Sequence, residues 1–255
     1  MIPFSSDVVS PIAYSPPCDC GLDLVYCDEA LLIVNKPAGL LSVPGRGMDK
    51  ADSMTTRVQN EFPDALSVHR LDMSTSGLLL FARRENMHRL ISRLFREHRV
   101  HKSYIAMVAG RMKITEGEIN LPLGADWPNR PRQKVDFTSG KSALTRYRLL
   151  ENTEGSEREI RGKEIQENTK NIGYLPLPQY EPDSVASRVE LEPVTGRTHQ
   201  LRVHMAAIGH PILGDMLYGG AASKAAGRLM LHARTLSLVH PHSGVSLSLI
   251  CEPPF

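Results

Sequence analysis

The apolar positions of the chain fall mostly into short runs that end at Gly or Pro, a pattern typical of β-strands. Residues 31–35 (LLIVN) form such a run before Lys36-Pro37, and residues 77–82 (GLLLFA) predict a buried strand. Shorter runs or weaker alternation predict further strands at 39–43, 104–109, 145–150, 185–191, 228–239 and 245–250. The folded region therefore begins near Leu24.

A spacing of three and four residues between apolar positions predicts helices elsewhere. Asp52 or Ser53 can cap a helix that reaches about residue 62, and residues 87–95 carry apolar side chains on one side and arginines on the other. Thr198 can cap a further helix that ends at Gly209. Many strands with a few interspersed helices predict an α+β fold around a mixed, mostly antiparallel central sheet.

Polarity separates one folded domain, residues 24–255, from two segments that lie outside its core. Residues 1–23 form a Pro/Ser-rich arm without the basic start of a secretory or transit peptide, and we expect it to be flexible. Residues 151–183 are polar and lack periodicity, which predicts a mobile surface insert. No run approaches the roughly 18–20 apolar residues of a membrane span. The four cysteines form no C-x-x-C pair, so we expect a cytoplasmic protein with free thiols.

The charge of the chain is unevenly distributed. The formal net charge is only +2, but residues 1–30 carry five acids and no Lys or Arg, and residues 151–183 carry eight acids against four bases. The remainder sums to +11, and residues 83–113 hold nine bases against two acids. Clustered bases in a folded core indicate phosphate binding, although a solvated helix face would give the same pattern.

A polar loop, residues 69–77 (HRLDMSTSG), precedes the buried strand and contains the first candidate for chemistry. A carboxylate at Asp72, next to a rigid strand and close to Arg70, would be held in one orientation and kept ionised. An ordinary turn, in which Asp72 and Ser74 bond the backbone, remains the alternative.

Arg202 lies between Leu201 and Val203 in the last predicted helix, where its guanidinium would be partly buried and would need a carboxylate partner. Asp72 is the unpaired candidate, so we predict an Asp72–Arg202 pair. Tyr104 enters a predicted strand and can stack on a base or transfer a proton, or simply fill the core.

The ten histidines suggest a metal site, but their spacings do not support one. His199 and His204 are five positions apart, whereas ligands on one helical face are four apart. We therefore expect no metal.

The motifs of the chain resemble those of the RluA-type pseudouridine synthases in order and spacing. The matching strings are HRLDMSTSGLLLFA, KSYIAMVAG, PVTGRTHQLRVHMAAIGHPILGD and LMLHA, and the likeness runs from about residue 24 to 253 apart from the insert. Residues 35–45 and 126–134 further resemble the dual-specificity branch, which acts on ribosomal and transfer RNA. Relatives often carry an N-terminal S4 RNA-binding domain, for which the roughly 23 preceding residues leave no room.

This resemblance implies a role for each candidate residue. Asp72 matches the catalytic aspartate, Arg202 its partner, and Tyr104 the tyrosine that contacts uracil. Arg70, with His69 beside it, would enter the RNA as the target nucleotide flips out. Leu231 matches a wall of the uracil pocket. A loop near the RNA would supply Trp127, Asn129, Arg130 and Gln133.

The implied reaction moves uracil from a nitrogen–ribose bond to a carbon–ribose bond without metal or cofactor. Asp72 could attack the sugar, add to the uracil ring or remove a ribose proton, and these routes stay open. We expect uridines in the tRNA anticodon stem-loop, in large-subunit ribosomal RNA, or in both. We also expect a monomer without an obligate protein partner. A catalytically silent RNA-binding protein of this fold and a histidine–metal hydrolase are the alternatives.

Overall fold

The computed structural model describes residues 14–153 and 185–255. Residues 1–13 of the expected arm and nearly all of the expected insert, from residue 154 onward, lie outside the described residues. None of the helices in the described part combines the length and the apolar character that a membrane crossing requires.

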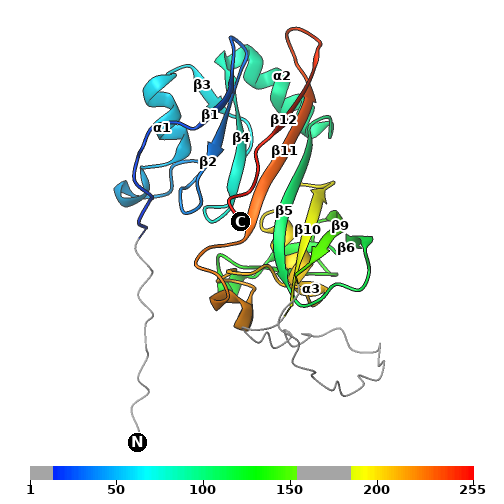
Figure 1. Cartoon of the computed structure of the whole chain (residues 1–255). Coiled ribbons are helices and arrows are strands. Elements are labelled where there is room, and N and C mark those ends of the chain that lie inside the picture. The colour runs from blue at the N-terminus through cyan, green and yellow to red at the C-terminus, as the bar shows by residue number, and fades with distance from the viewer. Residues whose placement is uncertain (1–13, 154–184) are drawn as a thin grey trace, which may run out of the picture.

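A large sheet forms the centre of the molecule (Figure 1). Its strands follow one another in space in the order β1 (Leu24–Cys27), β2 (Leu31–Lys36), β4 (Ser76–Arg83), β11 (Leu231–Val239), β5 (His101–Ala109), β10 (Ala186–Pro193), β9 (Leu144–Asn152) and β6 (Glu116–Asn120). Two short strands, β3 (Ala65–Ser67) and β12 (Ser246–Ile250), pair with β4 and β11. All of these pairs are antiparallel except β4 with β11, which confirms the predicted mixed, mostly antiparallel sheet.

The parallel pair of β4 and β11 depends on a glycine. Gly77 has φ +111°, and a Cβ built there would lie 2.3 Å from the backbone oxygen of Ala233 and 2.6 Å from its nitrogen. Any side chain would therefore push the strands apart. The close approach brings the loop before β4 next to the start of β11.

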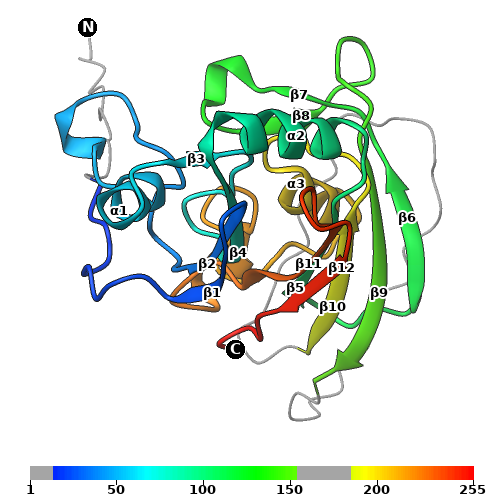
Figure 2. The same cartoon turned by 90° about the horizontal axis from the view of Figure 1, so that it is seen from above.

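Helices cover both faces of this sheet (Figure 2). The α-helices are α1 (Met54–Glu61), α2 (Arg84–Arg96) and α3 (Gln200–Ala207), and the 3₁₀-helices are η1 (Met48–Lys50), η2 (Trp127–Asn129) and η3 (Gly220–Lys224). A separate two-stranded hairpin, β7 (Leu123–Ala125) with β8 (Gln133–Val135), contacts α3.

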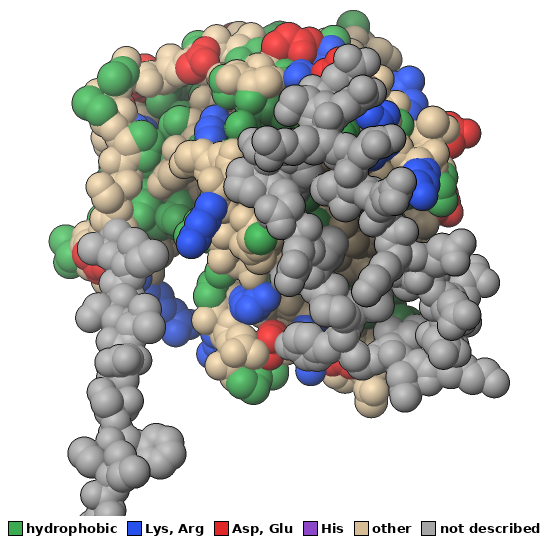
Figure 3. Space-filling model, turned by 60° about the horizontal axis from the view of Figure 1, so that its bottom comes forward, with side chains coloured by type: hydrophobic (Ala, Val, Ile, Leu, Met, Phe, Trp, Pro, Cys, Tyr) green, Lys and Arg blue, Asp and Glu red, His purple; other side chains and the backbone are tan. Residues whose placement is uncertain are grey.

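The apolar runs of β2 and β4 are continuous because both faces of these strands are buried. Leu31 and Ile33 belong to the core cluster that α2 covers through Ile91, while Leu32 and Val34 belong to the larger cluster on the other face. Residues of α1 and α3 pack into that larger cluster. The outer surface is different: Lys and Arg side chains occupy several separate places on the face in Figure 3.

Of two predicted helix N-caps, the one at Ser53 is confirmed and the one at Thr198 is wrong. The Ser53 side chain accepts a hydrogen bond from the Thr56 N–H and caps α1. At the start of α3 the N-cap is His199, which makes no side-chain cap hydrogen bond, and the Gln200 side chain accepts the N–H of Arg197 before the helix at 3.0 Å.

The strand predicted at 39–43 is absent, and this segment is a loop. Its backbone groups bind several different partners: the Gly39 N–H donates to Met73, the Leu41 N–H donates to the Tyr14 hydroxyl, and the Leu41 carbonyl accepts from Met54. These hydrogen-bond partners do not lie on one neighbouring strand, so the segment does not join a sheet.

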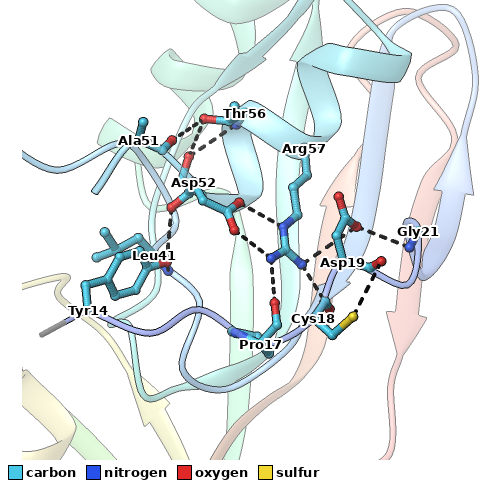
Figure 4. Close-up of polar contacts among 11 residues, drawn as sticks. Tyr14, Pro17, Cys18, Asp19, Gly21, Leu41, Ala51, Asp52, Thr56 and Arg57 are labelled. Atoms are coloured by element: carbon cyan, nitrogen blue, oxygen red, sulfur yellow. Dashed lines mark hydrogen bonds and ion pairs between the residues drawn. The ribbon is translucent and has the colours of Figure 1, made fainter. Parts of the chain in front are cut away.

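Residues 14–23 differ from the flexible arm expected at 1–23, since they are fastened to α1 (Figure 4). Arg57 donates to the carbonyls of Pro17 and Cys18 and forms a two-bonded ion pair with Asp52 at 2.9 and 2.8 Å. The Tyr14 hydroxyl donates to the Asp52 carbonyl. This segment therefore packs on the loop that leads into α1.

Candidate active site

A cleft of about 880 Å³ opens where the loop before β4 meets the starts of β5, β11 and α3. Its walls come from segments that are far apart in sequence, from residue 69 to residue 231. Most of the sequence-predicted residues meet here, namely His69, Arg70, Asp72, Tyr104, Arg202 and Leu231.

Asp72 lines this cleft and pairs with Arg202, as predicted. The Nη1 of Arg202 donates to Oδ2 of Asp72 at 3.1 Å, and the Asp72 side chain keeps 27% of its surface exposed. Among the described residues, Oδ1 of Asp72 accepts no hydrogen bond. One oxygen is thus held by the protein, and the other is available to a ligand.

Asp215 is the second and closer partner of Arg202, and the sequence did not reveal it. The Nε and Nη2 of Arg202 donate to its two oxygens at 2.8 and 2.7 Å, and Asp215 is buried. Burial by itself would lower the pKa of Arg202, but the hydrogen bonds and charge of Asp215, followed by those of Asp72, outweigh it and raise that pKa. The guanidinium is therefore a fixed cation. The signal that could have found Asp215 is the acid that ends GHPILGD, in the same matching string as Arg202.

His199 also lies near Oδ2 of Asp72. Its Nε2 lies 3.9 Å from Oδ2 of Asp72, and its Nδ1 is 2.7 Å from the Tyr218 hydroxyl. Burial lowers the pKa of His199 although the Asp72 carboxylate opposes this effect. The imidazole is therefore neutral near pH 7.

Two contacts fasten the loop that carries Asp72. Ser42 bonds Leu71 twice, since its hydroxyl donates to the Leu71 carbonyl at 2.7 Å and accepts the Leu71 N–H at 3.0 Å. Lys36 is completely buried, and its Nζ donates to three carbonyls, including that of Met73 at 3.1 Å. Burial lowers the pKa of Lys36 to about 7. Asp72 is thereby held on both sides along the chain.

Tyr104 and Leu231 form the apolar side of the cleft. Both are buried, at 8% and 3% exposed, and they lie on the neighbouring strands β5 and β11. Burial, with the charge of Asp72, raises the pKa of Tyr104, so its phenol stays protonated. A flat apolar group of the size of a nucleobase fits beside such a wall.

Arg70 and His69 are neighbours with different surroundings. Arg70 is exposed at the mouth of the cleft, free to reach a ligand. The ring of His69 stacks on Phe95 at 4.8 Å between centroids, and its Nε2 accepts the Leu80 N–H at 3.0 Å. Burial lowers the pKa of His69 to about 3. His69 thus connects the loop to α2 and β4.

The four remaining predicted residues, Trp127, Asn129, Arg130 and Gln133, do not line the cleft. They lie on the β7–β8 hairpin, where the Arg130 guanidinium sits 3.5 Å above the exposed Trp127 ring. The Asn129 side chain donates to Asp126, and the Gln133 N–H donates to the Tyr218 hydroxyl at 2.7 Å. The hairpin therefore touches the site through Tyr218.

No group of three or more His, Cys, Asp or Glu side chains suited to a metal ion occurs in residues 14–153 or 185–255. The groups that line the cleft include a carboxylate, a guanidinium, a phenol and an apolar wall. This set can hold a planar uncharged ring beside an ionised carboxylate.

Comparison with known proteins gives a consistent result. The family model for RNA pseudouridylate synthase matches residues 30–207. The dual-specificity RNA pseudouridine synthase RluA of Yersinia pestis is 46% identical over 233 residues, which cover 91% of this chain and 99% of that protein. Its namesake from Escherichia coli K12 is 44% identical and covers 95% and 98%. The structure of human RNA pseudouridylate synthase domain containing 1 superposes with a TM-score of 0.71 at 28% identity, over 94% of this chain and 87% of that one.

Proposed function

Because this chain belongs to the RNA pseudouridylate synthase family and is a pseudouridine synthase, we propose that it isomerises uridines with Asp72 as the catalytic residue. We further propose two substrate classes, stem-loops of large-subunit ribosomal RNA and the tRNA anticodon stem-loop. Relatives at 44–46% identity that carry the description dual-specificity support this breadth.

The observation that carries the proposal is the Asp72 carboxylate, fixed by Arg202 in a cleft with Tyr104 and Leu231 on its apolar side. The reaction breaks the bond between uracil nitrogen and ribose, turns the base and rejoins it through carbon 5, which then loses its proton. Each of the three routes open to Asp72 needs an ionised, oriented carboxylate oxygen. We assign Oδ1 to this step because Arg202 already holds Oδ2.

In the free protein, Tyr104 is suited to binding the base rather than to removing a proton. Its raised pKa leaves a neutral phenol, whose ring packs on the base and whose hydroxyl can donate a hydrogen bond. Leu231 would press on the same ring from β11.

The flipped nucleotide leaves a gap in the RNA that Arg70 is placed to fill. Flipping costs a few kcal/mol, and a guanidinium stacked in the gap offsets part of that cost. We propose that His69 holds Arg70 in place from behind. Trp127 and Arg130, already stacked on each other, would meet the RNA outside the cleft with Asn129 and Gln133 beside them.

We propose that the protein acts as a monomer in the cytoplasm, where both substrate RNAs occur, and without a metal or organic cofactor. A catalytically silent RNA-binding protein is the second candidate, since the same cleft could bind a flipped base without reacting. The Asp72–Arg202 contact favours the enzyme, because binding a neutral base needs no fixed carboxylate.

The test is tritium release from RNA labelled at uracil carbon 5. Asp72→Asn keeps the shape of the side chain but removes its charge, and we expect turnover to fall by at least roughly 10³-fold with RNA affinity retained. Asp72→Ala should behave alike. Full activity in both variants would exclude the proposed role of Asp72, and a wild-type protein that binds RNA without releasing tritium would establish the silent alternative.

The substrate classes are tested separately by mapping pseudouridine in ribosomal and transfer RNA from cells with and without the gene. Loss of sites in both classes supports dual specificity. Loss in one class only would restrict the enzyme to that class.

A further inference from the structure

His199 lies beside Asp72, and the reaction proposed above gives it no role. Its backbone has φ +54°, a left-handed conformation that is uncommon for residues other than glycine and is often found at functional sites. Its side chain is only 11% exposed, and its Nε2 is 3.9 Å from Oδ2 of Asp72. The structure therefore maintains an unfavourable backbone conformation while placing this ring next to the carboxylate.

A chain of hydrogen bonds determines which nitrogen of His199 carries the proton. The Tyr218 oxygen accepts the Gln133 N–H at 2.7 Å, so the hydroxyl proton of Tyr218 is available to His199 Nδ1, also at 2.7 Å. We assign Nδ1 as the acceptor, which places the proton of the neutral ring on Nε2. Oδ2 of Asp72 lies 3.9 Å from this nitrogen.

Tyr218 is itself held by the same residue that orients Arg202. Asp215 accepts the Tyr218 N–H at 3.1 Å while it binds the Arg202 guanidinium, which also lies 5.1 Å from the Tyr218 ring. Tyr218 is 5% exposed. One buried carboxylate thus holds Arg202 directly and His199 indirectly, through Tyr218.

We propose that His199 is a positioning residue for Asp72 and that Tyr218 couples it to the β7–β8 hairpin. This inference rests on the catalytic role of Asp72 in the proposed function. In the RNA complex, the Nε2–H would join Arg202 in restraining Oδ2 and so leave Oδ1 to the substrate. Hydrogen bonds in free enzymes are often long and shorten in the complex, so we expect the 3.9 Å distance to close when RNA lies on the hairpin.

Two substitutions at His199 separate positioning from a purely structural role. The amide nitrogen of glutamine reaches the place of Nε2, so His199→Gln keeps a donor toward Asp72. Asparagine reaches only the place of Nδ1, so His199→Asn loses that donor, yet asparagine suits a left-handed backbone better than glutamine does. A positioning role therefore predicts higher activity in His199→Gln, whereas a purely structural role predicts higher activity in His199→Asn.

We expect kcat for tritium release from a tRNA anticodon stem-loop transcript to be roughly tenfold higher in His199→Gln than in His199→Asn, with equal KM. Thermal unfolding should show His199→Asn to be at least as stable as His199→Gln. Equal kcat values, or a higher kcat in His199→Asn, would overturn the inference. His242→Asn, on the exposed turn after β11, is the matched control and should leave kcat unchanged.

The coupling is tested with Tyr218→Phe, which removes the hydroxyl and keeps the ring. We expect a loss of kcat of roughly tenfold, and no further loss when Tyr218→Phe is added to His199→Asn, because both act through one contact. Additive losses would contradict the relay. If Asp72→Ala is inactive while His199→Asn equals wild type, the positioning inference alone is wrong. Activity that survives Asp72→Ala would instead refute the proposed function.

Discussion

At the scale of single residues, the sequence predicted the Asp72–Arg202 pair but missed Asp215 and His199, which lie against it. Asp72 and Arg202 could be paired because a buried guanidinium needs a carboxylate. Asp215 could not be predicted because it lies in a short loop, which has no periodic pattern that marks it as buried. His199 escaped for another reason: its position depends on a left-handed backbone, which no local preference of histidine predicts strongly.

His69 also shows how burial changes a residue, and it gives the protein a dependence on pH. Its pKa is about 3 in the folded protein, against about 6.5 in an unfolded chain. Between these values the unfolded chain binds the extra proton, so this contribution to the free energy of unfolding falls as the pH drops from 6.5 toward 3.

We therefore expect His69→Gln, which retains an acceptor for the Leu80 N–H but does not titrate, to have a weaker pH dependence of stability. The measurement is urea unfolding of both proteins at pH 7.5 and pH 5. Wild type should lose more free energy of unfolding than the variant between these two conditions. An identical loss in both proteins would show that His69 is not buried in its neutral form.

At the scale of elements, apolar runs predicted the strands with two buried faces, and the three- and four-residue spacing of apolar positions predicted the helices. The short strands β3, β7 and β8 have three residues each, which is too few for a periodic pattern. The segment at 39–43 shows the opposite error, because its apolar residues serve a loop tied to the Asp72 loop. Tertiary contacts decided both cases.

The pairing of β4 with β11 predicts a large cost for Gly77→Ala. The added methyl group would meet the Ala233 backbone within 3 Å at a φ that disfavours a side chain, and we expect a loss of about 3–5 kcal/mol in stability. Gly244→Ala is the matched control, since Gly244 has φ +72° and no atom within 4 Å, and should lose only about 1 kcal/mol. Chemical denaturation measures both values, and equal losses would contradict a close approach at Gly77.

At the scale of the whole molecule, the predicted fold class is confirmed, but the order of strands in the sheet could not be derived. Strand β11 pairs with β4 although the paired residues Ser76 and His232 are 156 positions apart along the chain. Such long crossovers leave no mark in local sequence. The charge distribution was informative at this scale: the net charge of +2 conceals a basic remainder of the chain, and six Lys or Arg side chains line the cleft against the acids Asp72 and Glu192.

This distribution predicts how salt weakens RNA binding. Arg96 ends α2 at the edge of the cleft, whereas Arg111 follows β5 at the end of the strand away from the cleft. We expect Arg96→Ala to reduce the slope of log affinity against log salt by about one and to weaken different RNAs alike. Filter binding at several salt concentrations measures this slope. Arg111→Ala serves as the control, and an equal change there would mean that the cleft does not bind the backbone.

The place of β11 in the sheet also has a consequence during protein synthesis. This strand joins two otherwise separate parts of the sheet, β1–β4 on one side and β5, β10, β9 and β6 on the other, and it brings Leu231 to the cleft. A nascent chain exposes β4 and β5 long before residues 231–239 leave the ribosome. The site therefore cannot assemble on an incomplete polypeptide, and the newly made enzyme gains activity in one late step, after synthesis has passed its central strand.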